Sequence, residues 1–473
     1  QNLADAWRTF CSFLFRSHTI LLLHMSKTAT SVDSETNNST YRLNHALEAA
    51  QKQYTSKNPN SRNAFETAKN SLPGANTRSV LFYSPFPVTL KRARGALIED
   101  IDGHAYQDFL GEYTAGLYGH SHPKIMAAIS DALKKGLTLG GPTSSEAQYA
   151  SLICKRFPAI ERMRFCNSGT EANILALSSA RAFTNRTDIL VIDGSYHGGV
   201  LSFAGESPLN IPYPTHRIQF NDSEQAAKRI RAIGSKLAAV IIEPMIGAGG
   251  CIPGESEFLM TIREETSKTG ALLIFDEVMT SRHGATGLHG MLDIRPDIVT
   301  LGKYLGGGLS FGAFGGRADI IDRFDPTKTN AWSHAGTFNN NILSMTAGFT
   351  GLNEVFTTKI ADSFFIQGEQ FRERLKSRLN RLGLPIHLTG MGSMMALHFS
   401  STVPTFPYAP TPIQHKIYEL IHLEMMHLGQ FYARRGMINL SLPVTVDMCE
   451  EFCTALIKTL ERFRSEITEA LKI

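Results

Sequence analysis

Short apolar runs alternate with stretches of helical periodicity along the middle of this chain. The runs contain few polar residues, which is typical of strands buried on both faces of a mostly parallel sheet. The pattern predicts an α/β fold whose large domain, residues 106–345, has a mostly parallel central sheet flanked by helices. The predicted strands are 163–166, 189–192, 237–242, 271–275, 298–301 and 312–315.

The segments on either side of this region have a different pattern. Residues 41–70 have the apolar spacing of an amphipathic helix and a connector, as at Leu43 and Leu47. We predict that residues 41–105 and 346–473 together form a small α+β domain, with helices and short strands and a helix at the end of the chain. The short strands expected there are 79–83, 88–90, 96–100, 393–399 and 437–440.

Residues 1–40 are predicted to be disordered or a non-native extension, because residues 26–42 are rich in Ser, Thr and Asn. The chain does not begin with methionine. We favour the interpretation that residues 1–24 are upstream sequence and that Met25 is the true start. The alternative is a mitochondrial presequence, since this stretch is basic and poor in acids. Its longest apolar run, 19–23, is too short for a secretory or membrane-spanning segment.

Composition narrows the class of protein. The 473 residues are 42% hydrophobic and 19% charged with a net charge of +4, as in ordinary globular proteins. No basic run with interleaved aromatics favours a nucleic-acid partner, and no long apolar run favours a membrane. The scattered cysteines fit a reduced, intracellular protein, and Cys449 and Cys453 indicate one packed helix face and no metal site. We expect a cytoplasmic protein, or a mitochondrial one if the presequence is real.

An acid and a lysine follow two of the predicted strands. Asp276 ends the strand 271–275, and Lys303 follows the strand 298–301. Ligands of open α/β sheets bind beyond the carboxyl ends of strands, so both side chains are expected in one crevice. A cofactor with a basic ring nitrogen and an aldehyde needs this pair: the acid keeps the ring protonated, and the lysine forms a Schiff base and later moves the proton. That cofactor is pyridoxal 5′-phosphate (PLP).

A phosphate-binding helix start is predicted after the strand 163–166. Ser168 followed by Glu171 is a capping box, which marks the start of a helix. Gly169 permits a close approach of the backbone to a ligand, and the hydroxyls of Ser168 and Thr170 add to the N–H groups of the helix terminus. An ordinary capped helix is the alternative for this motif taken alone.

Other strand ends supply further candidates. Tyr196 lies in a glycine-rich loop where its ring can stack on a flat cofactor, opposite Val278. His197 either tunes the site or is a structural histidine, and Glu243 either faces the crevice or makes a capping or interdomain contact. Thr337 adds a hydroxyl for the phosphate, of the same subunit or of another.

These motifs together resemble the class III (ω-type) aminotransferases of PLP fold type I, over about residues 72–442. Within that class, two branches are similar to this chain. The runs TLGK at 300–303 and GAFGGR at 312–317 resemble glutamate-1-semialdehyde aminomutase. The runs NTRSVLFY at 76–83, EYTAG at 112–116, FDEVMTSR at 275–282 and GTFNNN at 336–341 resemble β-phenylalanine (β-amino acid) aminotransferase more closely.

The resemblance implies residues that bind the substrates. Arg78 matches the arginine for the carboxylate of the β-amino acid, and Arg435 matches a mobile arginine for the α-carboxylate of the 2-oxo acid; the alternative for Arg435 is a surface residue. Thr337 is implied to reach the phosphate of the neighbouring subunit in a homodimer with shared active sites. One departure is Ala433-Arg434 where the branch has Ser-Pro, and the N-terminal extension is another.

The implied reaction is PLP-dependent transamination from an amino acid, a β-amino acid in the first interpretation, to a 2-oxo acid such as 2-oxoglutarate or pyruvate. It follows a ping-pong mechanism with Lys303 as the Schiff-base lysine. The alternatives are a glutamate-1-semialdehyde-type 2,1-aminomutase, another ω-aminotransferase, a racemase or other PLP reaction, and a non-catalytic protein of the same fold. The intact Lys303, Asp276 and Ser168 argue against the last.

Overall fold

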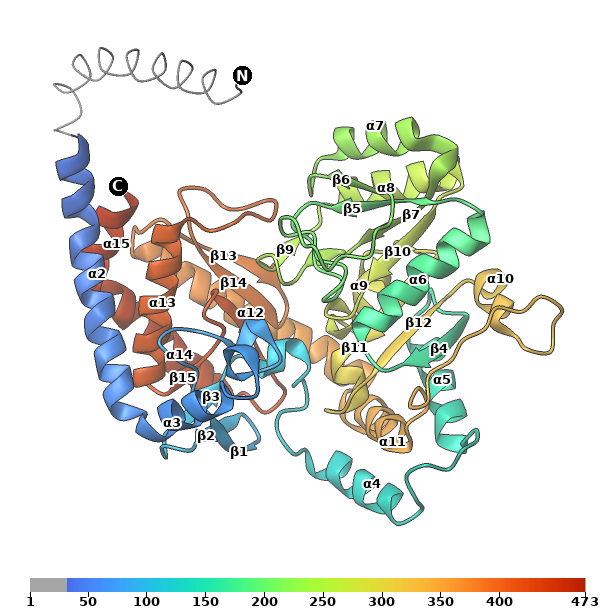
Figure 1. Ribbon diagram of the computed structural model, residues 1–473, viewed down its shortest axis with the longest axis horizontal. Coiled ribbons are helices and arrows are strands. Elements are labelled where there is room, and N and C mark those ends of the chain that lie inside the picture. The colour runs from blue at the N-terminus through green and yellow to red at the C-terminus, as the bar shows by residue number, and fades with distance from the viewer. Residues whose placement is uncertain (1–31, 473) are drawn as a thin grey trace, which may run out of the picture.

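The computed structural model describes residues 32–472 and shows two lobes side by side (Figure 1). The larger lobe is built on a seven-stranded sheet in which β12 alone runs antiparallel to its neighbours. This arrangement confirms the predicted α/β class with a mostly parallel sheet. In spatial order the strands are β4 (Arg162–Cys166), β12 (Gly312–Gly316), β11 (Ile298–Gly302), β10 (Leu272–Asp276), β7 (Leu237–Ile242), β5 (Asp188–Ile192) and β6 (Thr215–Ile218).

Both faces of this sheet are buried, as the uninterrupted apolar runs predict. Alternate residues of one strand belong to two different cores: Ile274 lies in the core under α6, and Leu273 and Phe275 lie in the core under α7 and α8. Helices therefore cover the sheet from both sides. The helices of this lobe are α4 (Pro123–Leu133), α5 (Ser144–Arg156), α6 (Gly169–Thr184), α7 (Ser223–Ile233), α8 (Ser256–Thr269), α9 (Gly287–Met291), α10 (Ala318–Ile321) and α11 (Ile342–Thr350).

The smaller lobe joins the two ends of the described chain. The short strand β15 (Gln430–Phe431) extends the N-terminal sheet of β1 (Leu90–Arg94), β2 (Leu97–Asp100) and β3 (Ala105–Asp108). A second sheet holds β13 (Ile386–Met391), β14 (Met394–Phe399) and β16 (Met437–Asn439). The helices here are α2 (Val32–Lys57), α3 (Pro59–Ala68), α12 (Thr358–Arg381), α13 (Pro412–His427), α14 (Val446–Arg462) and α15 (Arg464–Leu471). The limits given for the two domains stay a prediction.

The N-terminal helix α2 includes part of the segment for which the composition predicts disorder. It begins at Val32 and runs along α13 and α15 (Figure 1), and the disordered or non-native extension over residues 1–40 stays a prediction. Leu43 and Leu47 are buried, and Lys416 Nζ on α13 donates to Asn44 Oδ1 at 2.8 Å. The Ser/Thr/Asn-rich composition is thus overridden by packing further along the same helix. Residues 1–31, including the presequence candidate, lie outside the described residues.

Several strand predictions for the small sheets are inaccurate. Residues 79–83 do not form a strand: Ser79–Leu81 is a 3₁₀ turn, in which Leu81 N donates to the Arg78 carbonyl at 2.8 Å. The strand predicted at 88–90 instead begins at Leu90. The strands β6 and β13 are not predicted, because the polar sequence THRI and the glycine in IHLTGM hide the pattern of a strand.

Between residues 32 and 472, no helix is both long and apolar enough to cross a membrane, and no group of three metal-ligating side chains is found.

Candidate active site

Lys303 lies directly beyond the carboxyl end of β11, beside β10. Its side chain is partly buried, and Nζ donates to the carbonyl oxygen of Tyr113 at 2.6 Å. Burial first, and then the nearby Arg435 and Arg78, lower the pKa of the Lys303 amine to about 8. A lysine with so low a pKa is neutral in a useful fraction of molecules near neutral pH, and the neutral amine is the nucleophile.

Asp276 ends β10 in a set of mutually bonded polar groups, which we call the aspartate cluster: Asp276, His197, Asn173 and Thr300. Asp276 Oδ2 accepts from Asn173 Nδ2 at 2.8 Å and lies 2.8 Å from His197 Nδ1, while Oδ1 accepts from the Val278 N–H at 3.0 Å. Thr300 Oγ1 donates to Asn173 Oδ1 at 2.6 Å. All four side chains are buried, so the carboxylate has one fixed orientation.

The start of α6 adjoins this cluster. Ser168 is its N-cap and accepts from the Glu171 N–H at 3.1 Å, whereas Glu171 bonds to the Asn167 N–H and not to that of Ser168. The predicted cap is therefore correct, with a shifted return bond. A Cβ at position 169 would lie 2.8 Å from the methyl groups of Val278, so the close approach of the two segments requires Gly169. In the loop that follows β5, a Cβ on Gly198 would lie only 2.4 Å from Thr170 Oγ1, so this position also requires glycine.

Tyr196 and Glu243 lie at the neighbouring strand ends. The Tyr196 side chain is exposed, and its N–H donates to Glu243 Oε2 at 3.4 Å. Glu243 is buried, and its Oε1 accepts from the Gly247 N–H at 3.0 Å. Burial raises the pKa of the Glu243 carboxyl to about 7, with Asp276 adding to the rise and His197 opposing it.

Three arginines lie near Tyr113, and we call Arg78, Arg434 and Arg435 the arginine cluster. The guanidinium carbon of Arg435 lies 5.1 Å from the centre of the Tyr113 ring, and that of Arg78 lies 5.8 Å from it. Arg78 forms an ion pair with Glu112. Arg78 and Arg435, which the resemblance implies as substrate-binding residues, thus both lie against the ring of Tyr113. The backbone carbonyl of the same tyrosine accepts from Lys303.

The chain around Tyr113 is strained. Residues 111 to 114 all have positive φ, with values of 53°, 48°, 51° and 80°, and three of them are not glycine. Buried Arg282 helps to hold this segment, since its Nη1 donates to the Thr114 carbonyl at 3.4 Å and its Nη2 to that of Leu440. Such strain persists where the surrounding structure enforces it, and it concentrates at functional sites.

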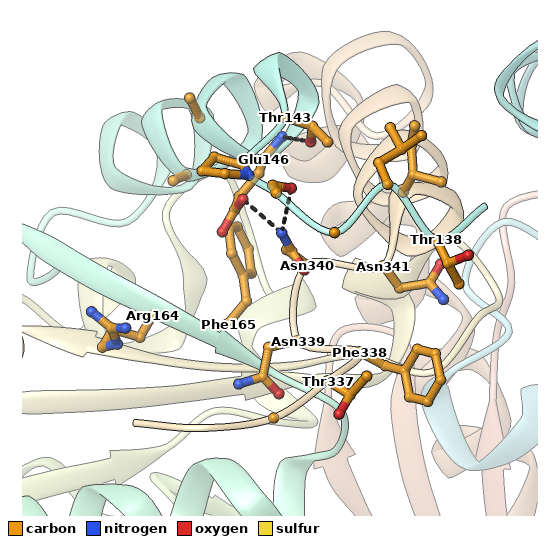
Figure 2. A pocket seen from close by; sticks show the side chains of 18 of the residues that line it. Thr138, Thr143, Glu146, Arg164, Phe165, Thr337, Phe338, Asn339, Asn340 and Asn341 are labelled. Atoms are coloured by element: carbon orange, nitrogen blue, oxygen red, sulfur yellow. Dashed lines mark hydrogen bonds between the residues drawn. The ribbon is translucent and has the colours of Figure 1, made fainter. Parts of the chain in front are cut away.

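Thr337 is not among these residues. It is exposed on a loop that borders a separate cavity of about 830 Å³ between residues 137–147 and 334–342 (Figure 2). Asn340 Nδ2 fixes this loop by donating to Glu146 Oε2 at 3.2 Å. Phe338 beside it is 56% exposed, which is unusual for a large aromatic side chain.

Comparison with known proteins decides the family. The sequence model of the family Aminotransferase class-III matches residues 82–420. This chain belongs to the class-III aminotransferases. It is accordingly an enzyme that transfers amino groups from amino acids with pyridoxal 5′-phosphate as its cofactor, as the sequence predicts.

Individual relatives of this class-III aminotransferase point to two branches. The chain is 45% identical over 415 residues to the β-phenylalanine transaminase of Variovorax paradoxus, covering 88% of this chain and 95% of the relative. A solved β-phenylalanine aminotransferase from Variovorax paradoxus superposes with a TM-score of 0.88 at 44% identity, covering 89% of this chain and 98% of that one. A glutamate-1-semialdehyde 2,1-aminomutase of Brevibacillus brevis is 36% identical over 357 residues, covering 72% and 83%.

The groups at the site fit the cofactor of a class-III aminotransferase. The start of α6 has backbone N–H groups without partners inside the helix, which suit a phosphate. Asp276 offers a carboxylate in a fixed orientation, and Lys303 offers an amine whose pKa is lowered. His197 Nε2 is buried and has no hydrogen-bond partner among residues 32–472. These are the anion site, the acid and the amine that the phosphate, the ring nitrogen and the aldehyde require.

Sequence reasoning missed three residues of the site. Asn173 follows Gly169 by one helical turn and so faces the same side of α6, which is the pattern that could have identified it. Thr300 precedes Lys303 on β11 with no pattern of its own to mark it. Tyr113 has no sequence pattern that marks it as a site residue, although it contacts Arg78 and Arg435, the two arginines that the resemblance implies.

Proposed function

We propose that this class-III aminotransferase takes its amino group from a β-amino acid and passes it to a 2-oxo acid. The observation that carries the catalytic part is the Lys303 amine, with its pKa lowered to about 8, at the end of a strand next to Asp276. The likeness to β-phenylalanine transaminase supports the donor class.

Each candidate residue has a task in this proposal. Ser168, Gly169 and Thr170 would hold the cofactor phosphate at the start of α6. Asp276 would hold the protonated ring nitrogen, oriented by His197 and Asn173. Val278 and Tyr196 would flank the ring, and Glu243 would fix the loop that carries Tyr196.

When bound, the cofactor supplies an electron sink for the negative charge that develops as a proton leaves the substrate. The protein supplies the base. The neutral Nζ of Lys303 would accept the proton from the amine-bearing carbon of the substrate and would give it up again as the amino group is transferred, and burial would keep water from competing for it. The Tyr113 carbonyl, 2.6 Å from Nζ, orients the amine between these two transfers.

The substrate carboxylates would bind the two arginines that lie against the Tyr113 ring. Arg78 would take the carboxylate of the β-amino acid, and Arg435 would take the α-carboxylate of the 2-oxo acid, since guanidinium binds carboxylate through two parallel hydrogen bonds. We expect Arg78→Ala to raise KM for β-phenylalanine about 10- to 100-fold while the spectrum of the bound cofactor stays normal. An unchanged KM would remove Arg78 from this role.

The direct test is an absorbance titration of the purified, PLP-loaded enzyme with β-phenylalanine and no acceptor. We expect the band of the pyridoxal form to fall and the band of the pyridoxamine form to rise, and 2-oxoglutarate or pyruvate to reverse the change. A spectrum that responds to α-amino acids but not to β-phenylalanine would contradict the proposed donor.

A 2,1-aminomutase is the second candidate, because a glutamate-1-semialdehyde 2,1-aminomutase is 36% identical to this chain. An aminomutase moves nitrogen within one substrate and needs no 2-oxo acid. Turnover of glutamate 1-semialdehyde without an acceptor, together with no transfer from β-phenylalanine to 2-oxoglutarate, would favour it.

We also propose that the working unit is a homodimer. Leu137, Leu139 and Phe338 are each more than half exposed around the cavity in which Thr337 lies (Figure 2). A second copy covering this face would bury those side chains and bring Thr337 to the phosphate site of its partner. Sedimentation equilibrium should give twice the chain mass for the wild type, and Phe338→Glu should give the monomer. A monomeric wild type would contradict the proposal.

A further inference from the structure

A small cavity beside Tyr113 presents two arginines at the tip of one turn. Gly436 N donates to the Ala433 carbonyl at 2.8 Å, which closes a tight turn with Arg434 and Arg435 at its centre. Both arginines line a cavity of about 310 Å³. Among the described residues that line it, none is an aspartate or a glutamate. The cavity therefore carries positive charge with no acid in its wall.

Among residues 32–472, neither of these guanidinium groups has a carboxylate partner closer than 4.0 Å. Arg434 Nη1 lies 4.0 Å from Glu419 Oε2, at the outer limit of an ion pair, and Glu419 Oε1 accepts from Gln51 Nε2 at 2.6 Å. Between residues 32 and 472, Arg434 donates no side-chain hydrogen bond, and Arg435 meets only the Met437 sulfur at 3.6 Å and the Tyr113 ring. Arg78 differs from both, since Glu112 is paired with it.

The remaining wall of the cavity adds hydrogen-bonding groups without opposing charge. His398 Nδ1 lies 3.2 Å from the Tyr408 hydroxyl, and its Nε2 lies 3.0 Å from the Gly250 carbonyl. Burial lowers the pKa of His398 to about 4, so the ring is neutral near pH 7. Glu243 is not part of this wall: it is buried behind Gly247, whose N–H donates to Glu243 Oε1 at 3.0 Å, and burial raises the pKa of its carboxyl to about 7. Two like charges on adjacent residues then attract a doubly negative ligand.

We propose that Arg434 is a specificity-determining residue that binds a second carboxylate of the substrate, so that the acceptor is a dicarboxylic 2-oxo acid. Arg435 binds the carboxylate next to the keto group, and Arg434 binds the one at the far end of a short chain, whose length the cavity volume limits. This inference rests on the proposed amino transfer and adds the acceptor class to it. It also gives a role to the arginine that stands where the resembling branch has proline.

The test compares two acceptors with the same five-carbon chain, 2-oxoglutarate and 2-oxopentanoate, which lacks the terminal carboxylate. Each is mixed with enzyme whose cofactor was first converted to the amine form by a donor. We expect Arg434→Gln to lower kcat/KM for 2-oxoglutarate about 10- to 100-fold and to change that for 2-oxopentanoate less than about twofold. Arg434→Lys should recover part of the loss, because the charge is kept.

Two controls separate this role from general charge or folding effects. Arg381→Gln, an exposed arginine at the end of α12, removes the same charge and should leave both acceptors unchanged. Calorimetry should show that the wild type binds glutarate at least about tenfold more tightly than pentanoate, and that Arg434→Gln removes this difference without altering the melting temperature.

Three results would overturn the inference. Equal losses for both acceptors in Arg434→Gln would make Arg434 a structural residue. Loss of the preference for 2-oxoglutarate in Arg78→Ala, with Arg434→Gln retaining it, would move the second carboxylate to Arg78. If no donor converts the cofactor to the amine form, the proposed function fails as well, and this result is distinguishable because it precedes any choice of acceptor.

Discussion

The aspartate cluster and the arginine cluster lie close together but are built in opposite ways. In the aspartate cluster, Asp276 is buried and its oxygens are bonded to His197, Asn173 and a backbone N–H. In the arginine cluster, Arg434 and Arg435 line a cavity, and among the described residues only Arg78 has a carboxylate partner closer than 4.0 Å. The aspartate cluster has its hydrogen bonds in place before any substrate binds, whereas the guanidinium groups of Arg434 and Arg435 are left to bind the carboxylates of a substrate.

This difference matches two requirements of a ping-pong enzyme. The chemistry at the cofactor is the same in both half-reactions, so its groups gain from preorganisation. The two substrates differ in shape, so the groups that bind them must accept more than one ligand. Tyr113 links the two regions, since its ring contacts Arg78 and Arg435 and its carbonyl accepts from Lys303.

Replacement of Lys303 beside the aspartate cluster should have the largest effect on activity. We expect Lys303→Ala to lower kcat more than about 1,000-fold, because both the attachment of the cofactor and the base for proton transfer are lost. The variant should keep its circular dichroism spectrum and oligomeric state. As a control, Lys236→Ala changes a lysine in the turn before β7 and should retain activity. Substantial turnover in Lys303→Ala would refute the central assignment.

The charge of the aspartate should have the next largest effect. Asp276→Asn keeps the shape and the bonds to Asn173 but removes the negative charge, so we expect kcat to fall about 100-fold or more. Absorbance titration of the bound cofactor should show the ring nitrogen losing its proton at a lower pH than in the wild type. An unchanged ring titration would mean that Asp276 does not contact that nitrogen.

The sequence predicts the fixed region much better than the adaptable one. Asp276 and Lys303 follow uninterrupted apolar runs that became β10 and β11, and their strand ends place them together by the rule for parallel sheets. Ser168 follows from its capping motif. These residues are predictable because local patterns set their positions, and the patterns are strong where both faces of the sheet are buried.

The arginine cluster has no such local pattern. Arg78 directly precedes residues 79–83, which the sequence predicts as a strand but which begin with a 3₁₀ turn. Arg434 and Arg435 lie in a turn between β15 and β16, near the other end of the chain. Their meeting at Tyr113 depends on contacts between segments more than 300 residues apart in sequence, as when Asn439 Nδ2 donates to the Leu110 carbonyl. Only the family resemblance indicates the roles of Arg78 and Arg435, and it indicates neither a role for Arg434 nor the contact through Tyr113.

The pH dependence of the lysine offers a test of the link between the two regions. A lowered pKa means that the charged form is disfavoured, so Lys303 becomes reactive as the pH rises through about 8. The rate at which apoenzyme captures PLP should rise over the same range. Because Arg435 is one cause of the lowering, Arg435→Gln should move the midpoint upward by up to about one pH unit. A midpoint that does not move would show that Arg435 does not contribute to the lowered pKa of Lys303 and that this arginine is not electrostatically coupled to the fixed region.

The smallest expected effect concerns Arg78, which has the closest carboxylate partner of the three clustered arginines among the described residues. Glu112 occupies Arg78 in the absence of substrate, and both side chains are partly exposed, so the pair is weak. We expect Glu112→Gln to lower KM for the β-amino acid by up to about fivefold, because the incoming carboxylate no longer competes with an internal one, and to leave KM for the 2-oxo acid unchanged. The double variant with Arg78→Ala should show no such gain. If Glu112→Gln instead raises both KM values, then Glu112 supports the strained turn of residues 111 to 114 and does not compete for Arg78, and the arginine cluster is more rigid than the comparison with the aspartate cluster implies.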